Sequence, residues 1–242
     1  MNISIAQIKP VKGDIPANIE KHIQFIDLAV SLKASSVFFP ELSLTGYEPE
    51  LAKELAIDHN DHRLDKFQQI SDHEKITIGV GVPTIYQKGV RISMIIFQPE
   101  KPRIMYSKQQ LHEDEFLYFE SGHEQILITF ENQKVIPAIC FESLQMDHAD
   151  KAVELGGQVY IASVAKSQNG INKAYEHYPE VARKHKIPVL MSNCIGECDN
   201  FISKGYSSVW TKEGKLIAQL ESQHEGIIVF NTETEKVIKQ VI

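Results

Sequence analysis

The stretch Lys134-Val135-Ile136-Pro137-Ala138-Ile139-Cys140-Phe141-Glu142-Ser143 is an apolar run that ends at a cysteine followed by polar residues. Its β-branched residues predict a buried strand of the kind found in parallel sheets. Such a strand would give Cys140 a rigid base with open space beyond it, which a catalytic thiol requires. An inert core cysteine is the alternative interpretation, because free cysteines are among the most buried residues.

The residues before this stretch predict a strand, a helix and a second strand. Residues 1–8 alternate apolar and polar side chains, and residues 16–33 repeat apolar residues at helical spacing. A short apolar strand, Val37-Phe38-Phe39, then stops at Pro40-Glu41. A strand-helix-strand unit implies parallel pairing, so we expect Glu41 to leave the sheet at its carboxyl edge, where α/β sheets usually bind ligands.

The rest of the chain continues this alternation and predicts one layered α/β domain over residues 1–242. The segment 48–75 is charged and predicts one or two solvated helices. We expect a hairpin of strands 76–82 and 90–97, separated by Pro83 and a turn at 87–89. Further strands are expected at 103–108, 159–162, 189–192, 205–211, 216–220 and 226–230, with helices at 147–155 and 173–185.

Composition excludes several classes of function. The net charge is −7 and the 25 basic residues are dispersed, which argues against a nucleic-acid partner. No apolar run is long enough to span a bilayer, and the alternating N-terminus does not resemble a signal peptide. Three cysteines, an odd number, favour a reducing compartment, so the cytoplasm is expected.

Two groups of residues invite a metal or redox interpretation. His59, His62 and His73 lie near acidic residues, but their spacing lacks the fixed offsets of a zinc site. The Cys194 and Cys198 spacing matches neither a usual zinc motif nor a thioredoxin motif. We therefore expect a solvated helix face and structural cysteines, with no metal or organic cofactor.

Cys140 together with two other strand-end residues could hydrolyse an amide. Glu41 can accept the thiol proton and pass it to the leaving nitrogen. Lys108, at the end of strand 103–108, can stabilise the oxyanion beside the backbone N–H of Phe141. The first product would be a thioester, which water activated by Glu41 would then cleave.

Phe39-Pro40-Glu41, Tyr106-Ser107-Lys108 and Ile139-Cys140-Phe141-Glu142 resemble, in order and spacing, the motifs of the nitrilase superfamily of carbon-nitrogen hydrolases. The resemblance implies Glu41 as general base, Lys108 as oxyanion stabiliser and Cys140 as nucleophile. It also implies a second glutamate that orients the lysine. Glu115, before Gly122, fits this role best, and Glu113 is the competing assignment.

The resemblance further implies an α-β-β-α sandwich that pairs into an eight-layered assembly, as a homodimer or a multiple of dimers. The chain departs from many members after Cys140, because it lacks the Arg-Phe-Pro that they carry beyond the acid. The substrate is therefore left open, and loops after Glu41, around Glu115 and after Ala162 are expected to line its pocket.

The most direct interpretation is a hydrolase that cuts a small amide of a carboxylic acid and releases ammonia or an amine. A true nitrilase or an N-carbamoyl amidase would use the same triad. A catalytically silent binding protein on this fold is a third alternative. A papain-like protease would need a histidine base, for which His148 and His185 are available without a supporting motif.

Overall fold

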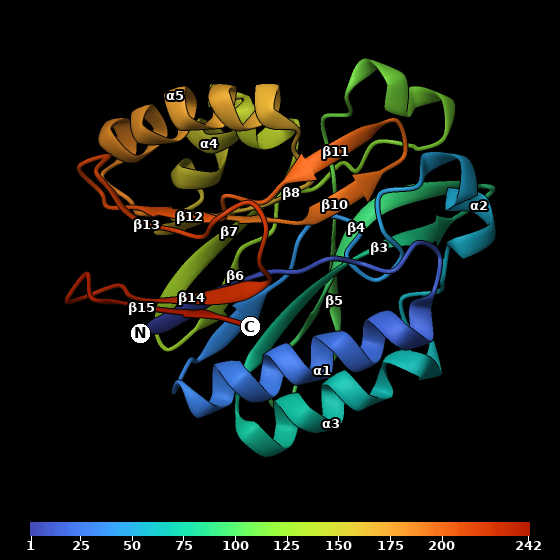
Figure 1. The fold of residues 1–242 in the computed structure, drawn as a ribbon, viewed down its shortest axis with the longest axis horizontal. Helices are drawn as coiled ribbons and strands as arrows, with labels where there is room; N and C mark the ends of the chain where they lie inside the picture. Colours follow the sequence, from blue (N-terminus) through green and yellow to red (C-terminus); the bar gives the residue numbers. More distant parts are fainter.

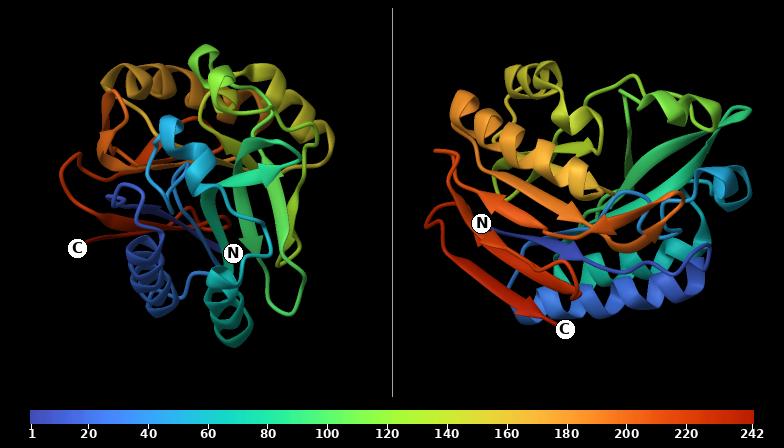
Figure 2. Two further views of the ribbon diagram at one scale, coloured as in Figure 1. Left: turned by 90° about the vertical axis from the view of Figure 1, so that its right-hand side faces the viewer. Right: turned by 45° about the horizontal axis from the view of Figure 1, so that its top comes forward.

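Two β-sheets form the middle of the molecule, in a computed structural model that describes residues 1–242. The larger sheet contains β1 (Asn2–Gln7), β2 (Ser36–Phe38), β3 (Thr77–Tyr86), β4 (Gly89–Phe97), β5 (Ile104–Ser107), β14 (Gly226–Asn231) and β15 (Val237–Val241). Their order is β15-β14-β1-β2-β3-β4-β5. β1 pairs in parallel with β2 and antiparallel with β14. The two ends of the chain therefore meet inside one sheet, where the blue first strand lies beside the red last strands in Figure 2.

The smaller sheet has the order β13-β12-β9-β8-β7-β6. Its strands are β6 (Ile128–Phe130), β7 (Gln133–Ile139), β8 (Val159–Val164), β9 (Val189–Asn193), β12 (Ser208–Trp210) and β13 (Leu216–Gln219). β7, β8 and β9 run in parallel, so the strand that leads to Cys140 is a parallel one, as predicted. A separate hairpin consists of β10 (Ile195–Cys198) and β11 (Phe201–Lys204).

Helices cover the outer faces of the two sheets (Figure 1). α1 (Ile15–Ser31) and α3 (Asp65–Glu74) pack on the larger sheet, and α4 (Met146–Glu154) and α5 (Gln168–His185) lie over the smaller one. A short helix, α2 (Ala52–Leu55), and four 3-10 turns occupy the loops; the turns are η1 (Pro49–Leu51), η2 (His62–Leu64), η3 (Glu113–Leu117) and η4 (Glu142–Leu144). This α-β-β-α layering confirms the predicted sandwich. None of the helices combines the length and the apolar character needed to cross a bilayer.

The alternation of side chains along the strands separates three apolar layers. In β4, Ile92, Met94 and Ile96 point into the core between the two sheets, whereas Ile95 and Phe97 point toward α1 and α3. The third core lies between the smaller sheet and the helices α4 and α5. Because successive residues of a strand face opposite sides, strands that are apolar on both faces can only lie between two covering layers.

The start of α1 follows the predicted signal. Asp14 caps the helix by accepting a hydrogen bond from the Ala17 N–H (3.0 Å), and Pro16 lies in the first turn. Pro is favoured there because the first N–H groups of a helix have no partner within it.

Several predicted boundaries were wrong. β3 does not stop at Pro83 but continues to Tyr86. The neighbouring β2 is too short to pair with Pro83, so the missing N–H of the proline leaves no acceptor of β2 without a donor. The Pro83 carbonyl accepts a hydrogen bond from the Ile57 N–H at 3.0 Å. α5 begins earlier than expected, and the strand expected at 205–211 is confined to β12. The strands β6, β10, β11 and β15 were not predicted, since they are short or partly polar and their patterns resemble loops.

Candidate active site

The predicted site residues meet at a cavity of about 460 Å³ between the two sheets' strand ends and α5. Lys108, Glu115, Cys140 and Phe141 all line this cavity. Glu41 lies behind them and is almost completely buried. Three of the lining segments follow strands β5, β7 and β8, so the edge of each sheet supplies part of the wall.

Lys108 is held between two carboxylates. Its Nζ donates to Glu41 Oε1 at 2.8 Å and to Glu115 Oε1 at 2.6 Å, and none of the three side chains is more than 2 % exposed. The other oxygen of the first carboxylate, Glu41 Oε2, is buried and makes no hydrogen bond. It is therefore free to accept a proton.

Cys140 lies directly beyond β7 in a turn that few side chains adopt. Its φ is 46°, in the left-handed region, which costs about 1–2 kcal/mol for a residue other than glycine. The Cys140 N–H donates to Ser163 O at 3.0 Å, and the thiol contacts Ala165 O at 3.7 Å. Strain of this kind at a residue that faces a cavity is typical of functional sites.

The pKa values of these groups are set mainly by burial. Burial raises the pKa of the Cys140 thiol to about 11, and the charge of Glu41 adds to this, while Lys166 and Lys108 oppose it. Burial also raises the pKa of Glu41 against the opposing charge of Lys108. The pKa of Lys108 is raised, because its two carboxylates outweigh the effect of its burial. At neutral pH the thiol is therefore protonated beside a carboxylate that is a stronger base than usual.

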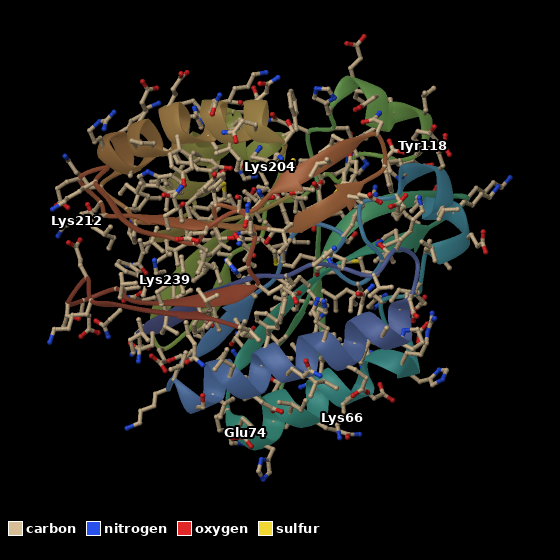
Figure 3. The ribbon with its side chains drawn as sticks, viewed as in Figure 1. Lys66, Glu74, Tyr118, Lys204, Lys212 and Lys239 are labelled. Carbon is tan, nitrogen blue, oxygen red and sulfur yellow. The ribbon has the colours of Figure 1, made fainter.

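Glu115, the residue expected to orient the lysine, is the one that contacts Lys108. It lies in η3, where Glu115 Oε2 accepts from the His112 N–H at 2.8 Å and Oε1 accepts from the Tyr47 hydroxyl at 2.8 Å. Glu113, the competing assignment, is exposed and makes no contact with Lys108. Tyr118 marks the outer end of this segment in Figure 3.

Gly122 allows the loop that carries Glu115 to return to Lys108. The Gly122 N–H donates to Lys108 O at 2.6 Å. A Cβ atom at this position would lie 2.2 Å from Ser107 O, so only glycine permits this approach. The loop between the lysine and this glycine is thereby closed over the site.

A third buried carboxylate, that of Glu142, joins the segment after Lys108 to the strand that leads to Cys140. Glu142 Oε2 accepts from the Gln109 N–H (2.6 Å), and Oε1 accepts from the Ile139 N–H and the Tyr106 hydroxyl (both 2.7 Å). Burial raises the pKa of Glu142 to about 7 against these hydrogen bonds.

The other candidates of the sequence do not line this cavity. His148 bonds to Tyr160 and Tyr106, His185 pairs with Asp150, and neither lines the cavity. Cys194 and Cys198 are buried with their sulfurs 3.7 Å apart. No group of three or more His, Cys, Asp or Glu side chains is arranged to hold a metal ion.

Sequence reasoning missed Tyr47, Glu142 and Lys166. Lys166 lines the cavity with its Nζ 3.9 Å from Cys140 Sγ. Lys166 lies in the loop after Ala162, which was expected to line the pocket, but nothing in its local sequence singled out this residue.

Almost the whole of this chain matches part of several longer proteins. Glutamine-dependent NAD(+) synthetase of Aquifex aeolicus is 29% identical over 239 residues, which cover 94% of this chain and 41% of that protein. The corresponding protein of Thermotoga maritima is 24% identical, with 98% and 42% covered. The chain thus spans about two fifths of these curated relatives. A probable nitrilase of Schizosaccharomyces pombe is 21% identical, with 97% and 89% covered.

Solved structures share the fold over almost the full chain. The NitN amidase from Neterenkonia sp. AN1 superposes with a TM-score of 0.87 at 18% identity, covering 96% of this chain and 92% of that one. A cysteine-to-alanine mutant of the Nesterenkonia sp. AN1 amidase in complex with butyramide gives 0.86 at 18% identity, with 95% and 89% covered. The model of the carbon-nitrogen hydrolase family matches residues 2–239. From this match, which runs from the first strand to the last, we conclude that the chain belongs to the carbon-nitrogen hydrolase family, in the nitrilase superfamily that its three motifs resemble.

Proposed function

We propose that this protein hydrolyses the amide of a small carboxylic acid through a cysteine thioester and releases ammonia or an amine. The observation that carries the proposal is the position of Lys108, which is held between Glu41 and Glu115 in the wall of the cavity that Cys140 also lines. A thiol, a base with a free oxygen and a fixed cation are the groups that acyl transfer needs.

In the first half of the reaction, Cys140 Sγ attacks the amide carbon while Glu41 takes the thiol proton. The base is needed because burial keeps this thiol protonated at neutral pH. The carbonyl oxygen becomes an oxyanion, which the Lys108 ammonium and the Phe141 N–H stabilise. Glu41 then gives its proton to the leaving nitrogen, and the C–N bond breaks to leave a thioester.

In the second half, Glu41 takes a proton from water as the water attacks the thioester. The same oxyanion site stabilises the second tetrahedral intermediate. Its collapse breaks the C–S bond and releases the acid, and Glu41 returns its proton to Cys140 Sγ, which restores the thiol. Glu115 holds Lys108 in place throughout, and its Tyr47 partner keeps that carboxylate fixed. All of these steps use groups of this chain alone.

The names and descriptions of similar proteins support a primary amide as the bond that is cut. The NAD(+) synthetases carry glutamine dependence in their names, and glutamine has a primary amide. The Nesterenkonia amidase was solved with butyramide, another primary amide. We further propose one catalytic domain that works as a homodimer in the cytoplasm, where free thiols such as these three persist.

Ammonia release from a panel of small amides, carbamoyl compounds and nitriles tests the proposal. We expect release from at least one primary amide, and loss of more than about 10³-fold of this rate in Cys140→Ala with the fold retained, because the sulfur is the nucleophile. Far-UV circular dichroism of the variant checks the fold. Ammonia release that survives in Cys140→Ala would overturn the proposed thiol mechanism. No ammonia release from any compound, together with a Cys140 that does not react with iodoacetamide, would favour a binding protein.

A further inference from the structure

Lys166 places a second positive charge beside the nucleophile. It lies between β8 and α5, and its Nζ is 3.9 Å from Cys140 Sγ. The residue is only 4% exposed and lines the cavity. In contrast to Lys108, which has two carboxylate partners, Lys166 is paired with none.

The backbone of Lys166 is fixed from two neighbouring strands. Its N–H donates to Asn193 Oδ1 of β9 at 2.9 Å, and its carbonyl accepts from the Lys204 N–H of β11 at 3.0 Å. Lys204 is labelled on this strand in Figure 3. The aliphatic stem lies over Gly170, where a Cβ atom would approach Lys166 Cβ to 3.2 Å. The backbone of Lys166 is thus fixed, and the 3.9 Å contact between Nζ and Cys140 Sγ places its ammonium beside the nucleophile.

The residues around Lys166 give it no direct ion pair, and Lys108 occupies the two nearest buried carboxylates. Lys173, also in the cavity wall, is a second cation. Burial lowers the pKa of His177, and the charge of Lys166 contributes, so this imidazole is neutral at pH 7. Two acids line the cavity, Asp114 and Glu115. Glu115 is paired with Lys108, and Asp114 Oδ1 lies 2.6 Å from His112 Nδ1.

A buried, unpaired cation is costly unless something of opposite charge reaches it. The reacting amide is neutral, so the amide itself cannot compensate Lys166. An anionic group on the acyl part of the substrate can compensate this charge. The acyl carbon must bond to Cys140 Sγ, and Lys166 Nζ lies 3.9 Å from this sulfur. A carboxylate that approaches Nζ to about 2.8 Å would then be only a short chain away from the acyl carbon.

We propose that Lys166 is a specificity-determining residue that binds a carboxylate on the acyl chain, so that the substrate is the monoamide of a short dicarboxylic acid. This inference rests on the proposed amide hydrolysis and narrows its substrate class. A cation that serves only to stabilise the Cys140 thiolate is the competing explanation of the same geometry.

Binding to the Cys140→Ala protein tests the inference without requiring turnover. Isothermal titration calorimetry would compare succinamate with 4-oxopentanamide, in which a methyl ketone replaces the carboxylate on a chain of the same length. We expect succinamate to bind at least tenfold more tightly, because only its carboxylate pairs with Lys166. The preference is expected to vanish in Cys140→Ala/Lys166→Met and to survive in part in Cys140→Ala/Lys166→Arg. Lys151→Met, on the exposed face of α4, is the matched control and should leave the preference intact.

Three results would overturn the inference: equal affinity for the two amides, no measurable binding of succinamate, or a preference that persists without Lys166. Turnover by the Cys140 protein gives a second criterion. Lys166→Met should reduce kcat/KM for succinamate at least tenfold more than for 4-oxopentanamide, whereas equal losses would assign Lys166 to the thiol alone. Failure of the proposed function would be seen differently, as absence of ammonia release from every amide in the presence of intact Lys166.

Discussion

At the scale of single residues, access and ionisation favour different cysteines. The hydrogen bond from Cys198 lowers the pKa of Cys194, whereas burial and Glu41 raise the pKa of Cys140 to about 11. Ionisation alone would therefore make Cys194 the more reactive thiol. Access has the opposite effect, since Cys194 and Cys198 are each 1% exposed and Cys140 faces the cavity.

We expect access to decide the outcome, because an alkylating reagent must reach the sulfur before it can react. With iodoacetamide at pH 7.5, Cys140 should be modified at least about tenfold faster than Cys194 or Cys198. Peptide mass spectrometry of samples taken over time measures the three rates. In guanidinium chloride the difference should vanish, which serves as the control. Equal rates in the folded protein, or faster labelling of Cys194, would count against the open site at Cys140.

Residue types and their order in the chain were enough to predict that Glu41, Lys108 and Cys140 lie at one site. Each follows an apolar run. Glu41 and Lys108 come after β2 and β5 of the larger sheet, and Cys140 comes after β7 of the smaller sheet, so the packing of the two sheets brings the three residues together. Tyr47 and Lys166 could not be predicted as site residues from the sequence. They lie in loops, where apolar periodicity carries no information, and their contacts to Glu115 and Cys140 depend on how distant loops pack.

At the scale of elements, Glu142 ties the end of β5 to the end of β7. Its carboxylate accepts from the N–H groups of Gln109 and Ile139, which are adjacent to Lys108 and Cys140. Loss of this link would let the two strand ends move independently. The triad would then lose the fixed distances on which proton transfer depends.

The raised pKa of Glu142 makes this link pH-dependent. The pKa is about 7 in the folded protein against an ordinary value of 4.5, so between these values the folded state holds more protons than the unfolded state. The contribution of Glu142 to the free energy of unfolding is therefore fully present below about pH 4.5, and it is lost as the pH rises toward 7. At about 1.4 kcal/mol per pKa unit, the loss is about 3 kcal/mol.

Glu142→Gln removes the titrating group and should remove this pH dependence. We expect the free energy of unfolding of the wild-type protein, minus that of the variant, to fall as the pH rises from 5 to 7.5. Urea denaturation at several pH values measures it, and Glu180→Gln, on the exposed side of α5, is the control. A difference that stays constant or rises with pH would show that the carboxylate is not destabilised by burial.

The elements themselves were predicted best where they are long and periodic. α1, β4 and β7 follow from their apolar patterns, because each buries a continuous face. β15 and the β10–β11 hairpin were missed, since they carry polar residues and depend on pairing with strands already in place. The antiparallel pairing of β14 with β1 could not be predicted either, because two strands so far apart in the chain carry no local signal of their pairing.

At the scale of the whole molecule, the four layers leave α4 and α5 as an outer surface (Figure 1). The resemblance to the nitrilase superfamily implies that two sandwiches stack near α4. Leu155, at the end of this helix, is 53% exposed, and an apolar side chain in that position is suited to contact with a second copy. The opposite side of the molecule offers a comparable residue, Ile238 on β15, which is 49% exposed.

We expect light scattering to give a mass of about 55 kDa, twice the 27.4 kDa of one chain. Leu155→Lys should raise the dimer dissociation constant by at least tenfold, because it introduces a charge that must be desolvated in the interface. Ile238→Lys adds the same charge to an equally exposed site and should leave the mass unchanged. A monomeric wild-type protein would contradict the stacking. Dissociation caused by Ile238→Lys alone would instead assign the contact to the edge of the larger sheet, where β15 has unpaired backbone groups available to a second copy.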